Sequence, residues 1–429
     1  MRQSLPLDNY EWLSQEEISQ YDPLTMPSNE SETGFIVEVT LDYPEHLHLE
    51  HNAFPLAPEH VEIDKSMLSP YASNVLQKLT RKRTYHAKKL TATFKRRKNY
   101  VCHGLNLKFY LEQGMKLIKI HRIMRFRQSP FIKDFIDMCT KKRAEAKTKT
   151  EKDFYKLLAN SLYGKMIESG DNRMDCRFVS SKQASLLRNT DPRTQAHMIF
   201  GEDLSMAFMN KAVVNLNQSW AVGFTILELS KLHMQELFYN KIKPAFDGNV
   251  SVLLSDTDSW VMELPVSSPD IAMKKLRELG IVDTSNYPPD HELFSSDVRN
   301  LTGYLKNENP NDPIIEVIAV RSKTYCIVTQ KDQQNKCKGV KSNVKDAISA
   351  DEYRKCVQEI TEHHVTQHSI QSKKHLNRLL KQKKLAFSSF DDKRFLLCSK
   401  HSVPYGSSLI ERSRNAGKCF FCMNPEMMK

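Results

Sequence analysis

The sequence lacks long hydrophobic runs, and none of its stretches approaches the roughly 18 apolar residues of a membrane span. The first residues also lack the apolar core of a secretory signal. The nine cysteines are an odd number, scattered through 429 residues, which argues against a disulfide framework and for a reducing compartment. We therefore expect an intracellular protein, nuclear or cytoplasmic, with no membrane partner.

Positive charge is in excess, with a formal net charge of +12 that favours a polyanionic partner such as nucleic acid. A merely basic surface is the alternative. The densest block spans residues 78–99, where Tyr85, Phe94 and Tyr100 are interleaved with basic residues. This block is either a solvated charged face or a track for the DNA backbone. Its basic residues are Lys78, Arg81, Lys82, Arg83, Lys88, Lys89, Lys95, Arg96, Arg97 and Lys98.

Hydrophobic periodicity predicts both strands and helices. Strands are predicted where β-forming residues alternate or run together, at 34–42, 117–126 and 314–328. Helices are predicted where apolar residues recur at helical spacing, at 131–147, 151–169, 219–239 and 350–385. Residues 1–34 are turn-rich and predict an irregular lead-in, and residues 170–212 have no clear period.

The chain is organised around residues 249–264, where two runs of β-formers flank Asp256, Thr257, Asp258 and Ser259. This pattern predicts a hairpin with a polar turn. Two carboxylates on a tight turn suit a hard divalent cation such as Mg²⁺, which prefers oxygen ligands. The alternative is a solvated turn in which Asp256 caps backbone amides.

A polar stripe is predicted on the helix at 151–169. Lys156, Asn160 and Tyr163 are spaced i, i+4, i+7 and share one face, and Gly164 follows them. Another face is suited to packing and carries Phe154, Leu158 and Leu162.

The preceding predicted helix places Arg143 and Lys147 four residues apart. Arg and Lys side chains that converge from two helices suit a triphosphate, because its charge is spread over many oxygens. For each pair alone, a solvated helix face is the alternative.

The combined order of these motifs resembles family B DNA polymerases. Lys156-x-x-x-Asn160-Ser161-x-Tyr163-Gly164, followed 92 residues later by residues 256–259, is similar to the second and third polymerase motifs. Lys323 and Tyr325 match the Lys-x-Tyr motif that family members use on the primer terminus. The similarity covers most of the chain and is greatest to the protein-primed branch, especially polymerases of Polinton (Maverick) elements and linear plasmids. Further similar stretches are 34–39, 42–44, 114–117, 226–231, 338–340 and 391–394.

The resemblance implies an α+β, right-hand polymerase fold: a palm of antiparallel sheet with helices, helical-hairpin fingers and a helical thumb. The first implied domain is a palm part with a protein-priming-type insertion (1–130). It is followed by the fingers (131–169) and a second insertion (170–215). The remaining domains are the palm with the Asp-Thr-Asp-Ser hairpin and Lys-x-Tyr (216–345) and a thumb-like basic region with a tail (346–429).

The implied activity is DNA-directed DNA polymerisation from dNTPs onto a primer 3′ hydroxyl, with two Mg²⁺ ions, in replication of a mobile element. Asp258 is the main implied metal ligand, with Asp256 beside it. The implied nucleotide-binding residues are Arg143, Lys147, Lys156, Asn160, Tyr163 and Gly164. The implied primer-binding residues are Thr257, Ser259, Lys323 and Tyr325. The implied partners are primer-template DNA, dNTPs and a terminal protein primer.

The first polymerase motif of the family, an Asp-x-x-x-Leu-Tyr-like sequence, is not found. Asp42 follows a predicted strand but lacks the Leu-Tyr order. The family's upstream exonuclease is not found either, so we expect an N-terminally truncated polymerase that is inactive or nearly so by itself. The alternatives are a DNA-binding remnant without catalysis and a metal-dependent nuclease built on Asp256 and Asp258.

Four residues near the C-terminus are spaced like metal ligands. Cys398 and His401 form Cys-x-x-His, and Cys419 and Cys422 form Cys-x-x-Cys. This order is compatible with a structural Zn²⁺. The favoured alternative is that the thiols are incidental.

Overall fold

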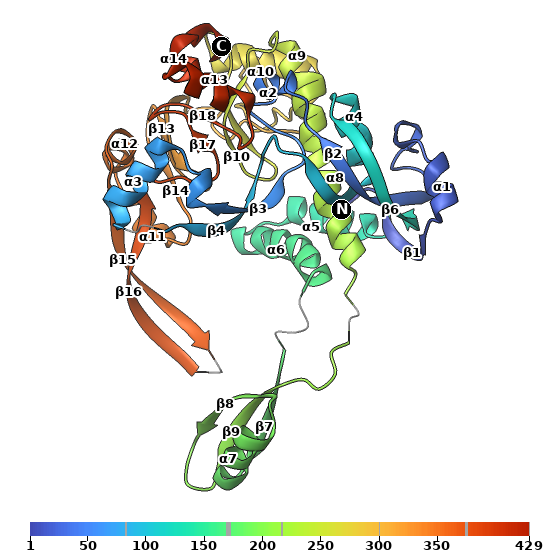
Figure 1. Cartoon of the computed structure of the whole chain (residues 1–429), viewed down its shortest axis with the longest axis vertical. Helices are drawn as coiled ribbons and strands as arrows, with labels where there is room; N and C mark the ends of the chain where they lie inside the picture. Colours follow the sequence, from blue (N-terminus) through green and yellow to red (C-terminus); the bar gives the residue numbers. More distant parts are fainter. Residues whose placement is uncertain (82–83, 169–172, 216–217, 300, 374–375, 429) are drawn as a thin grey trace. The chain divides into compact units, whose positions relative to one another are not determined.

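A computed structural model describes residues 1–81, 84–168, 173–215, 218–299, 301–373 and 376–428. The chain divides into two compact units of mixed helices and strands, which confirms the α+β class (Figure 1). One unit comprises Met1–Leu5, Pro130–Ile226 and Ser369–Leu380, and the other comprises Pro6–Ser129, Leu227–His368 and Lys381–Lys429.

Some predictions fall outside the described residues: the basic residues Lys82 and Arg83, the end of the helix predicted to 169, and the boundaries at 169–170 and 216. None of the described helices has the length and apolar character needed to cross a membrane.

A four-stranded sheet in the order β1-β6-β2-β5 forms the first part of the larger unit. Its strands are Leu5–Trp12, Lys116–Ser129, Thr33–Asp42 and Arg97–His103, in that order. β2 pairs antiparallel with both β5 and β6, and the strands predicted at 34–42 and 117–126 are confirmed.

The predicted irregular lead-in was wrong, because β1 is an edge strand. Pro6 is tolerated there near the strand start, and most of the strand is exposed, so no strong burial pattern marked it. Two short helices follow, α1 (Gln15–Gln20) and η1 (Pro23–Thr25).

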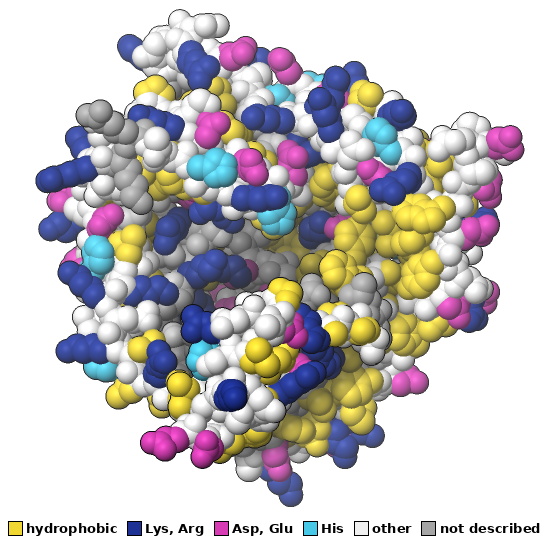
Figure 2. Space-filling view, turned by 60° about the horizontal axis from the view of Figure 1, so that its bottom comes forward, with side chains coloured by type: hydrophobic (Ala, Val, Ile, Leu, Met, Phe, Trp, Pro, Cys, Tyr) yellow, Lys and Arg dark blue, Asp and Glu magenta, His cyan; other side chains and the backbone are white. Residues whose placement is uncertain are grey.

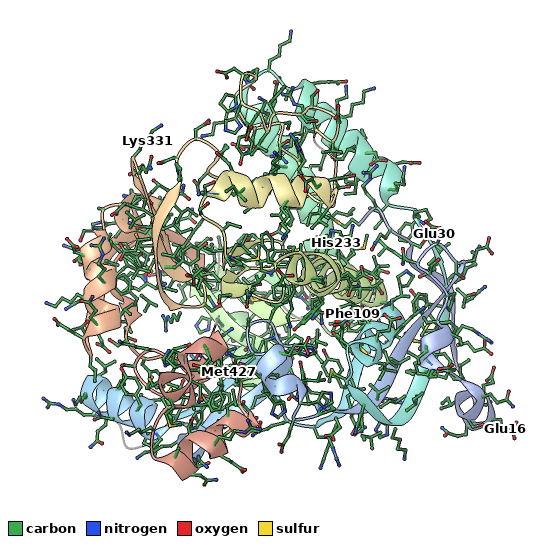
Figure 3. The ribbon with its side chains drawn as sticks, turned by 90° about the horizontal axis from the view of Figure 1, so that it is seen from above. Glu16, Glu30, Phe109, His233, Lys331 and Met427 are labelled. Carbon is green, nitrogen blue, oxygen red and sulfur yellow. The ribbon has the colours of Figure 1, made fainter. Side chains whose placement is uncertain are left out.

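Helix α4 (Gly104–Glu112) and helix α8 (Trp220–Glu236) are tied together beside this sheet. Glu228 of α8 is buried; its carboxylate accepts from the backbone N–H of His103 at 3.2 Å, and its carbonyl accepts from the Asn106 side chain at 2.9 Å. Phe109 of α4 lies 6.4 Å, ring to ring, from Tyr239 in the π-helical turn Leu237–Ile242 that continues α8 (Figure 3). The helix predicted at 219–239 is thus confirmed. A short helix, α9 (Lys243–Ala245), ends it.

The predicted hairpin at 249–264 is also present. β10 (Ser251–Ser255) pairs antiparallel with β11 (Trp260–Glu263), and helix α10 (Pro269–Glu278) follows. A second sheet contains β12 (Ile314–Arg321), β13 (Thr324–Thr329) and β14 (Gln333–Cys337). The single strand predicted at 314–328 was therefore wrong, since the chain reverses at Lys323, whose φ is +60°.

The region predicted as one helix from 350 to 385 contains a helix and a β-ribbon. Helix α12 (Ala350–Gln358) follows the short α11 (Ser342–Lys345) and packs on the second sheet. β15 (Glu362–Lys373) and β16 (Leu376–Ser388) then form a long two-stranded ribbon (Figure 1). The prediction of a helical thumb was wrong for this stretch, because its residues pair as a two-stranded sheet.

A second core joins the β3–β4 hairpin and α3 to the C-terminal elements, with residues Ile63, Leu76, Phe395, Leu409 and Phe421 among its buried members. The bounds are β3 Glu59–Asp64, β4 His86–Thr91 and α3 Pro70–Thr80, with the short α2 (Leu47–Glu50) and η2 (Lys65–Met67) nearby in the chain. The C-terminal elements are β17 Phe395–Leu396, β18 Ser402–Val403, α13 Ser408–Ala416, α14 Phe420–Met423 and η5 Pro425–Met428.

The smaller unit contains the predicted helical hairpin, α5 (Lys133–Glu145) and α6 (Lys149–Met166). It also holds a small module of β7 (Met174–Val179), α7 (Ser181–Thr190), β8 (Thr194–Ile199) and β9 (Ser205–Asn210), in sheet order β7-β9-β8 (Figure 1). Its strands are six residues each, too short to show a period in the sequence.

A candidate nucleotide- and DNA-binding site

Backbone hydrogen bonds between its own residues close the Asp-Thr-Asp-Ser turn. The N–H of Asp256 donates to the carbonyl of Ser259 at 3.0 Å, and the N–H of Asp258 donates to the carbonyl of Asp256 at 2.7 Å. Thr257 has a φ of +59°, a left-handed conformation that is unfavourable for a β-branched residue. Strained residues of this kind concentrate at functional sites, so the turn is a candidate site on geometric grounds.

A second strained turn lies against the first. Lys323 connects β12 and β13 in the same left-handed region, and its Nζ lies 3.0 Å from Oδ1 of Asp256. Burial, and then the negative charge of Asp256, raise the pKa of Tyr325, so the phenol also lies near this carboxylate. The fold thus brings together Asp256, Lys323 and Tyr325, although the two motifs are far apart in the sequence.

The two carboxylates fit one hydrated Mg²⁺. Both are accessible, since Asp258 is exposed and the Asp256 side chain is 44% exposed. Mg²⁺ is commonly held by one or two carboxylates, with waters and substrate phosphates completing the shell. Among the described residues, no third Asp, Glu, His or Cys joins them in a group tight enough to hold a metal. The described residues therefore offer ligands for one ion and do not complete a site for two.

The predicted nucleotide-binding stripe lies on α6. Lys156, Asn160 and Gly164 are exposed and Tyr163 is half-buried, which raises the pKa of its phenol. A Cβ added to Gly164 would meet no atom within 4 Å, so this end of the stripe is open to a ligand. The opposite face packs less than predicted, because Phe154 is 56% exposed while Leu158 and Leu162 are half-buried.

Arg143 and Lys147 do not form the predicted i, i+4 pair on one helix. α5 ends at Glu145 and Ala146 is extended, so Lys147 lies in the connection to α6. Its backbone N–H donates to Oε2 of Glu151 at 3.1 Å, the same oxygen that caps Thr148 at the start of α6. The capping box starts α6 at Thr148, and both basic side chains remain exposed.

The nucleotide-binding residues predicted on α5 and α6 belong to the smaller unit, and Asp256, Asp258, Lys323 and Tyr325 belong to the larger one. Within the larger unit the fold brings Asp256, Lys323 and Tyr325 together.

The basic block at 78–99 divides into structural and surface charges. Arg97 is fully buried and Phe94 is 4% exposed, with the Phe94 ring stacked on His48, so neither is available to DNA. Lys89 pairs with Asp392 at 3.1 Å and Arg96 pairs with Asp42 at 3.2 Å. The exposed, described members for which no ion pair is identified are Lys78, Arg81, Lys88, Lys95 and Lys98. Lys and Arg side chains elsewhere are spread over the visible surface, with Asp and Glu among them (Figure 2).

One basic surface was missed by the sequence analysis. On β16, the residues at odd positions from Leu379 to Leu385 are all exposed, and Lys381 and Lys383 lie between the two leucines. Residues 379–385 show no alternation of apolar and polar side chains in the sequence, and their Leu, Lys and Gln have high helix propensity, so the sequence offered no signal for this strand.

The four residues of the predicted zinc set also lie together. Their ligand atoms are all within 4.8 Å of one another.

Residues 30–243 match the family described as DNA polymerase type B, organellar and viral. This part of the chain is therefore similar to family B DNA polymerases. It contains β2, α4, both helices of the hairpin and all of α8, whereas Asp256 and Lys323 lie beyond it.

No curated protein matches the chain. It is similar to two solved structures. Phi29 DNA polymerase complexed with primer-template DNA, in a post-translocation binary complex, is 13% identical with a TM-score of 0.41, over 88% of this chain and 63% of that one. Phi29 DNA polymerase in an orthorhombic crystal form is 14% identical with a TM-score of 0.43, over 83% and 58%. The chain thus spans about three fifths of the length of these polymerases.

Proposed function

We propose that the chain carries the nucleotide- and primer-binding parts of a protein-primed, DNA-directed DNA polymerase that replicates a mobile element. In this reaction the primer 3′ hydroxyl attacks the α-phosphate of a dNTP under template direction, and pyrophosphate leaves. The observation that carries the proposal is the 3.0 Å contact between Lys323 and Asp256, which joins two candidate motifs in one place. The similarity of residues 30–243 to family B DNA polymerases supports it.

At the turn, Asp258 and Asp256 would hold Mg²⁺ together with substrate phosphates. Such an ion, when bound, activates the 3′ hydroxyl and neutralises charge on the leaving group. Lys323 offsets the charge of Asp256 and offers an ammonium to a primer phosphate. Tyr325 lies near the same carboxylate, where its ring contacts the primer terminus. Thr257 and Ser259, exposed on the turn, border the same strand.

On the helical hairpin, Lys156, Arg143 and Lys147 bind the triphosphate through charge-assisted hydrogen bonds. Asn160 orients the nucleotide, and Tyr163 packs against its sugar or the nascent base pair. Gly164 leaves room for this approach, since the space above its Cα is open. Arg143 lies near the end of α5, Lys147 lies in the connection, and the other four residues lie on α6.

We further propose that the chain by itself transfers nucleotides at or near background. The described residues supply two carboxylates and no third ligand close to them, whereas two-metal transfer needs ligands for both ions. The proposed function is therefore tested best by template-dependent dNTP binding, which precedes nucleotide transfer.

The test measures binding of a dideoxy-terminated, fluorescent primer-template to the full chain by anisotropy, with Mg²⁺ and each dNTP in turn. We expect the dNTP that pairs with the next template base to tighten binding, because only a polymerase site selects by the template. Asp258→Asn should remove this gain. Asp247→Asn is the matched control, since Asp247 is exposed in another left-handed turn of the same unit and should keep the gain.

Lys156→Ala should raise the concentration of the matching dNTP that is needed to tighten primer-template binding. It should leave DNA binding without dNTP unchanged. Equal binding with all four dNTPs would support a DNA-binding remnant instead, and cleavage of DNA without nucleotides would support the nuclease. If the chain extends a primer with a 3′ hydroxyl and Asp258→Ala abolishes this extension, the low activity proposed for the isolated chain is contradicted.

A further inference from the structure

Two short turns near the C-terminus present four metal-binding side chains to one point. Cys398 and His401 lie in the turn between β17 and β18. Cys419 is the residue before α14, and Cys422 lies within that helix. The two pairs come from segments separated by α13, and all four residues belong to the larger unit.

Four of the six distances between their ligand atoms are close to those of a tetrahedral site, and all six are within 4.8 Å. Nδ1 of His401 lies 3.3 Å from Sγ of Cys398 and 3.4 Å from Sγ of both Cys419 and Cys422. Sγ of Cys398 lies 3.9 Å from Sγ of Cys422. Around tetrahedral zinc, the usual bond lengths place two sulfurs about 3.8 Å apart and a sulfur and a nitrogen about 3.6 Å apart.

Hydrogen bonding alone does not explain this arrangement. A neutral imidazole nitrogen has one lone pair and accepts one hydrogen bond well, yet three thiols lie around the same Nδ1. Thiols are also weak donors, so three of them gain little from one acceptor. A cation at the centre of the four atoms satisfies all of them at once.

We propose that Cys398, His401, Cys419 and Cys422 bind one structural Zn²⁺. Three sulfur ligands and one imidazole are a common structural zinc set, and the four side chains leave no open position for catalysis. Zinc suits these soft ligands better than Mg²⁺ does, which separates this site from the carboxylate turn.

The surroundings of the ligands support a built site. The backbone N–H of Lys400 points at Sγ of Cys398 at 3.4 Å, which stabilises thiolate charge. The turn is held by the N–H of Leu397, which donates to the carbonyl of His401 at 2.9 Å. Phe421 is 4% exposed and its ring lies 5.7 Å from the His401 ring, so apolar packing shields one side of the ligands.

The proposed zinc ligands belong to segments that pack together in one hydrophobic core. Cys419 and Phe421 are buried in the same cluster as Ile63, Leu76 and Phe395, so a bound ion would fix α14 onto β17, β3 and α3. Ligands held by a metal in the folded state alone stabilise that state, because the unfolded chain does not present them together.

The first experiment measures zinc by atomic emission in the full chain, purified without chelator under reducing conditions. We expect about one zinc per chain, lost in Cys419→Ser and in Cys422→Ser. Cys176→Ser is the matched control, because Cys176 is an exposed cysteine of the other unit, and it should retain the metal. Substoichiometric zinc that is the same in all variants would overturn the proposal.

Two further measurements keep the proposal falsifiable where a serine variant fails to fold. His401→Cys should retain one zinc, and its Co²⁺-substituted form should show stronger sulfur-to-metal charge-transfer absorption than the wild-type chain. A chelator should lower the melting temperature of the wild-type chain and leave that of folded Cys419→Ser unchanged. A disulfide between Cys398 and Cys422, seen as a loss of two hydrogens in the mass of the reduced-purified chain, would overturn the zinc site. None of these results depends on polymerase activity.

Discussion

Arg97 and Lys98 are neighbours in the sequence and carry the same charge, but they differ in burial. Arg97 is fully buried; its guanidinium donates to the carbonyl of Ala57 at 2.9 Å and of Thr93 at 2.6 Å and pairs with Glu59 at 3.2 Å. Lys98 is exposed. At the residue scale, burial therefore decides which charges of the basic block support the fold and which face solvent.

We predict that Arg97→Met lowers the free energy of unfolding by about 3–5 kcal/mol, because it leaves Glu59 and the carbonyl groups without their buried partner. Lys98→Met should change it by less than about 0.5 kcal/mol, as is usual for exposed positions. Urea unfolding followed by circular dichroism measures both. Equal effects of the two substitutions would show that the buried network contributes nothing.

At the scale of elements, local patterns were sufficient for some predictions and not for others. The hairpin around residues 256–259 and the helices α5, α6 and α8 have a clear period over their whole length, and each was predicted. The strands β15 and β16 were predicted as helix, because their lysines, leucines and glutamines have high helix propensity. Pairing between distant strands overrides such propensities.

The same limit applies to the candidate site. The identities of Asp256, Asp258 and Lys323 were evident from short motifs, but the contact between Asp256 and Lys323 depends on the path of the intervening chain. Likewise, the spacing of the Cys and His residues was visible, and their convergence was not. Sequence motifs thus identified most residues of each set, and only the fold shows which of them meet.

The exposed lysines of β16 give a prediction for this element. Under the proposed function, Lys381 and Lys383 contact DNA phosphates, because they lie on one exposed face of an extended ribbon. The double substitution Lys381→Glu, Lys383→Glu should weaken primer-template binding and reduce the slope of log affinity against log salt by about one for each lysine.

The matched control for the ribbon is Lys331→Glu. Lys331 is exposed at the turn between β13 and β14 (Figure 3). Lys331→Glu changes the net charge by as much as one ribbon substitution alone, so it is compared with the single variant Lys383→Glu. The slope should remain unchanged in Lys331→Glu. If both single variants reduce the slope equally, the effect is one of net charge and the ribbon has no special role.

At the scale of the whole molecule, residues far apart in the chain hold the larger unit together. Arg394 donates to the side chain of Asn52 at 2.9 Å across 342 positions, and burial lowers its pKa to about 10. The N–H of Ser408 donates to Nδ1 of His48 at 3.0 Å across 360 positions. The N-terminal and C-terminal parts of this unit therefore fold as one body around buried polar groups, and its stability depends on their protonation.

His51 is the clearest such group. It is 1% exposed, and its Nδ1 lies 2.7 Å from the hydroxyl of Tyr43. Burial lowers its pKa from 6.5 to about 4; Glu50 opposes this shift, and the charges of Lys243, His46 and His48 add to it. The folded state therefore keeps His51 neutral at pH values where the unfolded chain protonates it.

The sign of the pH effect follows from this difference. Below pH 6.5 the unfolded state binds the proton that the folded state excludes, so stability falls as the pH is lowered toward about 4. Between pH 7.5 and 5.0, His51 should account for a loss of about 2 kcal/mol, at about 1.4 kcal/mol per pH unit below the unfolded pKa. His51→Gln keeps an acceptor for Tyr43 and does not titrate, so its unfolding free energy in urea should fall by that much less over the same interval. The same pH dependence in both proteins would show that folding does not lower the pKa of His51.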